Sequence, residues 1–179
     1  MKLHRFVLSF VLISLSTTAF AQSNPQKSFD TLKTLAGTWQ GRVATYPPQK
    51  GMGDGSLVQV SMHVTSRGNA LLHEMRAANT PDDPAKYDHP VTMIYLDSNR
   101  LLLTHYCDAG NRPRMVARSS PDGKKVEFYF LDVSGGTEHG RMDHAVFTTV
   151  DANHHTEDWT YIMPGNTAVR AHMDLQRTK

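Results

Sequence analysis

Apolar and polar side chains alternate along most of the chain, from Thr38 almost to its end. A period of two residues is typical of β-strands that bury one face, and Gly, Pro, Asn and Asp interrupt it at the short intervals expected of turns. The pattern predicts ten strands, over residues 38–46, 57–65, 70–78, 91–96, 101–107, 114–119, 125–131, 144–150, 154–162 and 167–176. Their spacing leaves no room for an internal repeat or a domain linker, which indicates a single all-β domain.

A short helix is expected before the first strand. Ser28 can cap it, and Phe29, Leu32 and Leu35 follow at three-residue spacing before Gly37 ends it. Residues 22–27 are polar and are expected to form a flexible leader. The folded domain is therefore expected over residues 28–179.

The connections between the predicted strands alternate in length. Longer connections cover residues 47–56, 79–90, 108–113, 132–143 and 163–166, and tight ones cover 66–69, 97–100, 120–123 and 151–153. If consecutive strands run up and down, the tight hairpins and the helix lie at one end and the longer loops at the other. The sequence therefore predicts a single up-and-down antiparallel β-barrel, with a short helix closing one end and loops around an open mouth.

The first 21 residues depart from this pattern. Lys2 and Arg5 form a basic start, residues 6–15 are apolar, and Ala19-Phe20-Ala21 is a small-x-small cleavage site. These features predict a secretory signal peptide over residues 1–21, cleaved after Ala21, and a periplasmic or secreted protein. No stretch approaches the roughly 20 apolar residues of a spanning helix, and no cysteine follows the cleavage site to carry a lipid, so no membrane anchor is expected.

The charge and the cysteine content limit which partners and which covalent cross-links are expected. The chain has 19 Lys and Arg residues against 17 Asp and Glu residues, and loss of Lys2 and Arg5 would leave the mature chain neutral. Such a balance argues against the broad cationic face that binds nucleic acid. Because Cys107 is the single cysteine, the chain can form no internal disulfide bond.

Three segments carry a resemblance to known proteins. The segment Leu35-Ala36-Gly37-Thr38-Trp39-Gln40-Gly41 resembles the opening of lipocalin-like proteins, in which a Gly-x-Trp after a short helix begins the first strand. Residues 103–115 and the strand 155–161 resemble a family of small secreted bacterial lipocalin-like proteins of unknown function. The resemblance covers nearly the whole mature chain, and it implies a calycin-type barrel without naming a ligand.

The ten strands and the Thr-Trp-x-Gly opening are also similar to nitrobindins, whose barrels hold haem through a histidine on the last strand. That resemblance points to His172. Strand alternation, however, places Val169, Ala171, Met173 and Leu175 on one face and Arg170, His172 and Asp174 on the other. We therefore expect His172 to point away from the lumen and expect no cofactor, with haem as the alternative.

The more apolar face of each strand is expected to line the lumen. Trp159 and Tyr161 would draw Glu157 inward, where it would need a partner or a raised pKa. Both faces of residues 101–107 are mixed, so either His105 or Tyr106 points in. Methionines on inward faces can adapt to irregular ligands. The candidate ligand-binding residues are His73, Met75, Met93, His105, Tyr106, Met115, Phe128, Phe130, Glu157, Trp159 and Tyr161.

These observations favour an exported lipocalin-like protein that binds a small, largely apolar molecule in its lumen. The alternatives are a haem- or metal-binding barrel and an acid/base enzyme that pairs Glu157 with His73 or His105, which requires a separation of about 3 to 4 Å. The histidine spacings match no zinc signature, and no Gly-x-Ser-x-Gly elbow is present. No catalytic or metal-ligating residue is therefore assigned.

Overall fold

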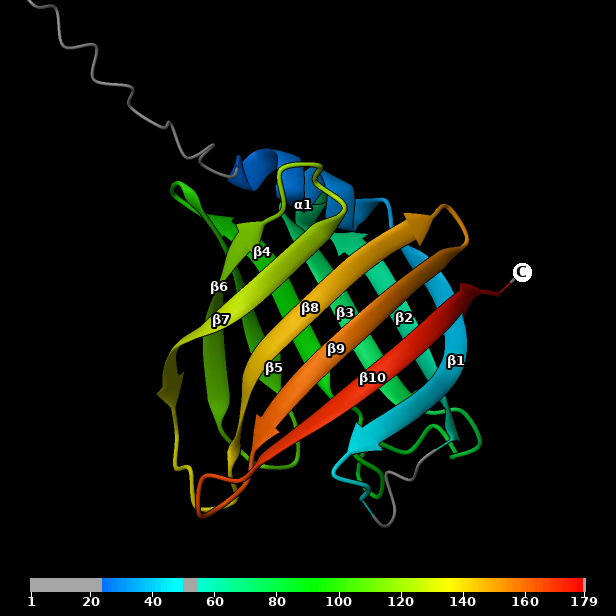
Figure 1. The fold of residues 1–179 in the computed structure, drawn as a ribbon, viewed down its shortest axis with the longest axis vertical. Helices are drawn as coiled ribbons and strands as arrows, with labels where there is room; N and C mark the ends of the chain where they lie inside the picture. The colour runs from blue at the N-terminus through cyan, green and yellow to red at the C-terminus, as the bar shows by residue number, and fades with distance from the viewer. Residues whose placement is uncertain (1–23, 50–54, 179) are drawn as a thin grey trace, which may run out of the picture.

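The computed structural model describes residues 24–49 and 55–178, and Figure 1 shows its fold. Ten strands form a closed antiparallel barrel in which each strand pairs with its neighbours in sequence and β10 pairs with β1. The strands are β1 (Gly37–Tyr46), β2 (Ser56–Thr65), β3 (Ala70–Ala77), β4 (Val91–Asp97), β5 (Arg100–Tyr106), β6 (Arg112–Ser119), β7 (Lys125–Ser134), β8 (Arg141–Asp151), β9 (His154–Ile162) and β10 (Ala168–Arg177). The predicted up-and-down barrel is confirmed. The predicted signal peptide lies outside the described residues.

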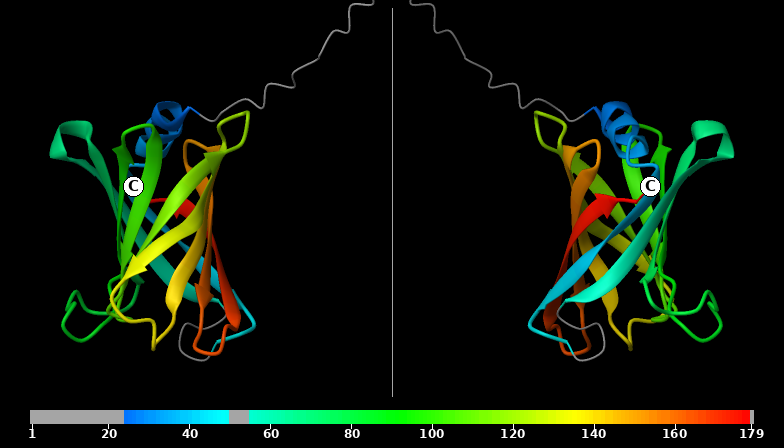
Figure 2. Two further views of the ribbon diagram at one scale, coloured as in Figure 1. Left: turned by 90° about the vertical axis from the view of Figure 1, so that its left-hand side faces the viewer. Right: turned by 90° about the vertical axis from the view of Figure 1, so that its right-hand side faces the viewer.

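The two ends of the barrel differ as the loop lengths predicted. Helix α1 (Pro25–Lys33) and the tight connections β2–β3, β4–β5, β6–β7 and β8–β9 lie at one end, which we call the helix end. The longer connections, over residues 78–90, 107–111, 135–140 and 163–167, lie at the opposite loop end, as both side views in Figure 2 show. Anything that enters the lumen from the loop end therefore meets the strands before it meets α1.

Helix α1 begins earlier than predicted because Asn24, rather than Ser28, caps it. The side-chain oxygen of Asn24 accepts a hydrogen bond from the backbone N–H of Lys27 at 3.2 Å. Pro25 takes the first helical position, where its missing N–H costs nothing and its φ suits the helix. Residues 25–27 are thus helical and do not belong to a leader. No helix in the described part of the chain is long and apolar enough to cross a membrane.

Strands β6, β7 and β8 extend further toward the loop end than predicted, so the expected long loop over 132–143 shortens to residues 135–140. Cross-strand pairing supplies the reason. Arg112 lies opposite Ser134, and Arg114 forms a two-pronged ion pair with Asp132 on the outer wall. A bidentate guanidinium–carboxylate pair favours a defined register over an open loop.

The helix end of the lumen is closed by Trp39. Its side chain is fully buried, and its indole N–H donates to the backbone oxygen of Leu35 at 2.8 Å. The guanidinium of Arg177 lies 4.1 Å from the centre of the Trp39 ring and forms a cation–π contact with it. Arg177 also donates to the backbone oxygens of Ala36, Thr34 and Ala152, at 2.8, 3.2 and 3.0 Å. One side chain thereby ties the helix, β1 and the β8–β9 turn together.

Replacing Arg177 with alanine is predicted to lower the free energy of unfolding by about 2 kcal/mol, because three backbone acceptors and the Trp39 ring lose their partner. Urea denaturation followed by tryptophan fluorescence measures the change. Arg170→Ala, an exposed position on the same strand, is the matched control and should change stability by less than about 0.5 kcal/mol. Equal effects of the two substitutions would contradict this role of Arg177.

Candidate functional site in the barrel lumen

Three polar side chains line one wall of the lumen at neighbouring positions. The register places His73 of β3 opposite Thr92 of β4, and Thr92 opposite His105 of β5. Residues directly opposite one another project from the same face of a sheet. All three side chains are fully buried, so this face is the inner one.

The facing wall contributes the alternate residues His155, Glu157 and Trp159 of β9, all of them buried. The Glu157 carboxylate lies 3.0 and 3.2 Å from Nε2 of His73. It also lies 3.0 Å from Nε2 of His155 and accepts the indole N–H of Trp159 at 2.9 Å. An ionised carboxylate can only accept, so both histidines donate through Nε2. We call Glu157, His73, His155 and Trp159 the Glu157 cluster.

The Glu157 cluster keeps its carboxylate ionised. Burial alone raises the pKa of Glu157, but the charge of His73 and the hydrogen bonds from His155 and His73 outweigh it and hold the pKa well below its usual range. The partner that a buried Glu157 needs is thus present. With three donors on its two oxygens, Glu157 acts as a fixed anion and not as a proton donor.

His105 behaves differently because no carboxylate faces it. Its Nδ1 lies 2.8 Å from the Thr92 hydroxyl. Burial, and next the nearby charge of His73, lower the pKa of His105 to about 3. His105 is therefore neutral at physiological pH and contributes hydrogen bonding without charge.

Three imidazole nitrogens inside the barrel have no hydrogen-bonding partner among the residues that the structure describes. They are Nδ1 of His73, Nδ1 of His155 and Nε2 of His105, each inaccessible to solvent. Buried polar atoms are normally paired, and exceptions call for a specific explanation. A polar atom of a ligand bound in the lumen would provide such a partner.

Exposure of the inner surface rises toward the loop end. Phe128, Phe147 and Trp159 are buried and pack edge to face around the lumen. Nearer the loops, inward-facing side chains are only half-buried: Met75, Phe130, Met142, Tyr161, Val169 and Ala171. The inner surface is thus closed at the helix end and partly open at the loop end.

Most of the predicted ligand-binding residues lie on this inner surface. His73, Met75, His105, Met115, Phe128, Phe130, Glu157, Trp159 and Tyr161 share its face. The open choice on β5 resolves in favour of His105, which is fully buried, whereas Tyr106 is 45% exposed on the outside. Tyr106 is therefore not a lumen residue.

Met93 was also wrongly predicted to face the lumen. Register places it opposite Leu72 and Thr104, and Leu72 lies between the inward-facing Leu71 and His73. Met93 therefore points outward, and Thr92 takes the inner position. Sequence reasoning missed Thr92 because Thr92, Ile94 and Leu96 are scarcely more apolar than Val91, Met93 and Tyr95; only pairing with His73 distinguishes the two faces.

His172 points away from the lumen, as alternation predicted. Its Nδ1 lies 2.7 Å from a carboxylate oxygen of Asp158 on the outer wall, and half of its side chain is exposed. Within the described residues, no group of three His, Cys, Asp or Glu side chains is arranged to hold a metal ion. Haem ligation by His172 from inside the barrel would therefore conflict with this geometry.

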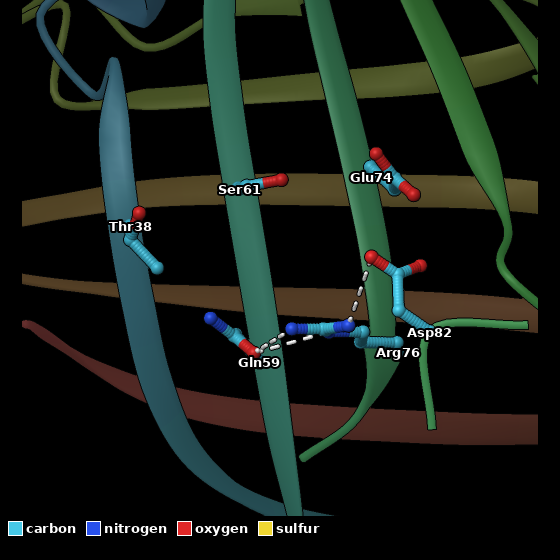
Figure 3. A pocket seen from close by; sticks show the side chains of 6 residues that line it. All are labelled: Thr38, Gln59, Ser61, Glu74, Arg76 and Asp82. Atoms are coloured by element: carbon cyan, nitrogen blue, oxygen red, sulfur yellow. Dashed lines mark hydrogen bonds and ion pairs between the residues drawn. The ribbon is translucent and has the colours of Figure 1, made fainter. Parts of the chain in front are cut away.

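A hollow lies on the outer wall, over β1, β2 and β3 (Figure 3). It measures about 220 Å³ and is lined by Thr38, Gln59, Ser61, Glu74, Arg76 and Asp82. Its guanidinium is already paired, since Arg76 donates twice to the Gln59 side-chain oxygen and lies 3.7 Å from Asp82. Its lining side chains are all polar or charged, so it is a poor match for an apolar molecule.

Substituting Glu157 by glutamine is predicted to lower the free energy of unfolding by about 3 kcal/mol, because the buried N–H donors of His73, His155 and Trp159 lose their carboxylate acceptor. Chemical denaturation at neutral pH measures this. Asp158→Asn removes the neighbouring but exposed carboxylate and should cost less than about 1 kcal/mol. A Glu157→Gln variant as stable as the wild-type protein would contradict the assignment of a charged cluster.

Stability is predicted to fall as pH drops from about 6.5 toward about 3, because the unfolded chain protonates His105 while the folded chain keeps it neutral. This histidine contributes a slope of up to about 1.4 kcal/mol per pH unit. Urea denaturation of His105→Gln at several pH values should give a flatter profile above about pH 5.5, where Glu157 is ionised in the folded and the unfolded chain alike and does not contribute. His63→Gln, on the outer wall, should retain the wild-type slope; a wild-type slope in His105→Gln would contradict the prediction.

No protein-family model matches the chain, and no curated protein matches it. Among solved structures it is similar to Rv2717c from M. tuberculosis, with a TM-score of 0.60 and 13% identity over 85% of this chain and 98% of that one. A protein of unknown function from the DUF3598 family of Nostoc punctiforme matches with a TM-score of 0.43 and 8% identity, covering 82% of this chain and 48% of that one. A redesigned β-barrel matches with a TM-score of 0.36 and 11% identity, covering 82% and 94%. Rv2717c shares the fold at an identity that transfers no function.

Proposed function

We propose that this protein is an exported, lipocalin-like barrel that binds a small, largely apolar molecule in the loop end of its lumen. Three features support the proposal. The helix end is closed by Trp39 and α1, the loop end is ringed by the longer connections, and the inner surface between them is mostly apolar. Ligand pockets in small barrels combine such a surface with a few polar groups.

The observation that carries the proposal is the partial exposure of the apolar inner side chains near the loops, above a buried row of histidines. Apolar side chains such as Met75, Met142 and Ala171 pack against the core and are only partly buried. Covering them with an apolar ligand would remove further apolar area from water. The His105 nitrogen without a partner would then orient the ligand.

The alternatives have less support. The separation required of an acid/base pair is met by Glu157 and His73, at 3.0 Å, but both side chains are fully buried and the carboxylate is occupied by three donors. The haem alternative rests on a last-strand histidine that is paired with Asp158 on the outer wall. A visible spectrum after haem titration tests that alternative: an intense Soret shift with 1:1 stoichiometry would revive it.

The neutral fluorescent probe N-phenyl-1-naphthylamine is predicted to bind the purified protein with a saturable increase in emission. Ala171→Trp should weaken binding at least about tenfold, because the indole would occupy the partly open inner surface. Fluorescence titration measures both. Native mass spectrometry of protein isolated from its own host should in addition show a bound small molecule.

Arg170→Trp is the matched control, since it places the same side chain on the adjacent, outward-facing position of β10. It should leave probe binding within about twofold of wild type, and both variants should unfold cooperatively. Equal loss of binding in the two variants, or no saturable binding by the wild-type protein, would refute a lumenal site.

A further inference from the structure

We propose that Nε2–H of His105 donates a hydrogen bond to an uncharged oxygen of the lumenal ligand, so that the protein selects neutral apolar molecules bearing a carbonyl or ether oxygen. This inference rests on the proposed lumenal binding and specifies the class of ligand. It follows from the partners of His105 and Thr92, from their place in the barrel, and from the charges around them.

The contact between Thr92 and His105 determines which ring nitrogen carries the proton. Both side chains are fully buried, and Nδ1 of His105 lies 2.8 Å from the Thr92 hydroxyl. Were that hydroxyl to accept, its own proton and Nε2 of His105 would both lack a partner, whereas donation by the hydroxyl leaves only Nε2–H unpaired. The Thr92 hydroxyl therefore donates to Nδ1, and neutral His105 carries its proton on Nε2.

The Nε2 atom of His105 is a donor without an acceptor among the described residues, and it lies toward the loop end. Strand β5 runs from the helix end to the loop end and ends at Tyr106, the next residue. On β9, which runs the same way, His155 and Glu157 come nearer the helix end. The centre of the Trp159 ring lies 5.5 Å from that of His105 and offers an apolar flank. A ligand entering between the loops would therefore meet His105 and Trp159 before His155 and Glu157.

The charges around His105 favour a neutral ligand. The anion of Glu157 is already matched by His73, so the Glu157 cluster holds no spare positive charge for an incoming carboxylate. Near the loop end, the Arg141 guanidinium packs over the Phe130 ring and pairs with Asp143 at 2.7 Å. A buried carboxylate or ammonium would lack a counter-charge, whereas a carbonyl oxygen needs only one donor.

The test compares three small probes of similar shape by displacement of N-phenyl-1-naphthylamine: 4-phenylbutan-2-one, butylbenzene and 3-phenylpropanoate. In His105→Leu the affinity for the ketone should fall about fivefold, the worth of one hydrogen bond, while that for butylbenzene should stay the same or rise. His105→Gln should retain most of the ketone affinity, because its amide N–H lies near the position of Nε2–H. The 3-phenylpropanoate should bind most weakly.

Nitrogen-15 NMR of histidine-labelled wild-type protein provides a readout that does not depend on variants. It should show His105 protonated at Nε2 and not at Nδ1, with Nε2 shifting when the ketone is added. Equal ketone affinity in wild type and His105→Leu, protonation at Nδ1, or strongest binding of 3-phenylpropanoate would overturn this inference while leaving lumenal binding intact. Failure of every probe, the naphthylamine included, would instead remove the proposed function itself.

Discussion

The buried carboxylate of Glu157 is the constraint on which the interior of this barrel depends. An ionised group without water is costly unless donors surround it, and here His73, His155 and Trp159 do so. His73 comes from β3 and the other two from β9, so the contact joins strands that are far apart in the sheet order. The cluster thereby fixes the relative position of two walls that share no backbone hydrogen bonds.

That constraint also shapes what the lumen can bind. Because Nε2 of His73, Nε2 of His155 and the Trp159 indole all face the Glu157 carboxylate, the cluster keeps only its two Nδ1 atoms for any other contact. Nearer the loop end, His105 pairs with Thr92 and has one nitrogen without a partner among the described residues. The helix end of the lumen is closed by Trp39 under Arg177. A ligand would therefore lie on the half-buried apolar surface near the loop end.

Much of the fold was predictable from the sequence because the alternation of apolar and polar residues within a single strand shows which of its faces is buried. Alternation located all ten strands. It also predicted that Glu157 faces inward with Trp159 and that His172 faces outward. It failed where both faces of a strand are similar. On β4 and β5 only register with His73 decides that Thr92 and His105 face the lumen while Met93 and Tyr106 do not, and register is a property of the neighbouring strand. The polar atoms that would face the proposed ligand were not predictable, since their partners are set only when strands far apart in the sequence meet.

The ionisation of Glu157 tests this account most directly. Carbon-13 NMR of the Glu157 side-chain carboxyl, followed from pH 7 downward and assigned by comparison with Glu157→Gln, reports the charge of that one group. The account predicts that its chemical shift stays constant at least to pH 4.5, the usual value for a glutamate, because the donors of His73, His155 and Trp159 hold the anion. A titration midpoint above pH 4.5 would show that Glu157 is protonated in the folded barrel and would contradict the account.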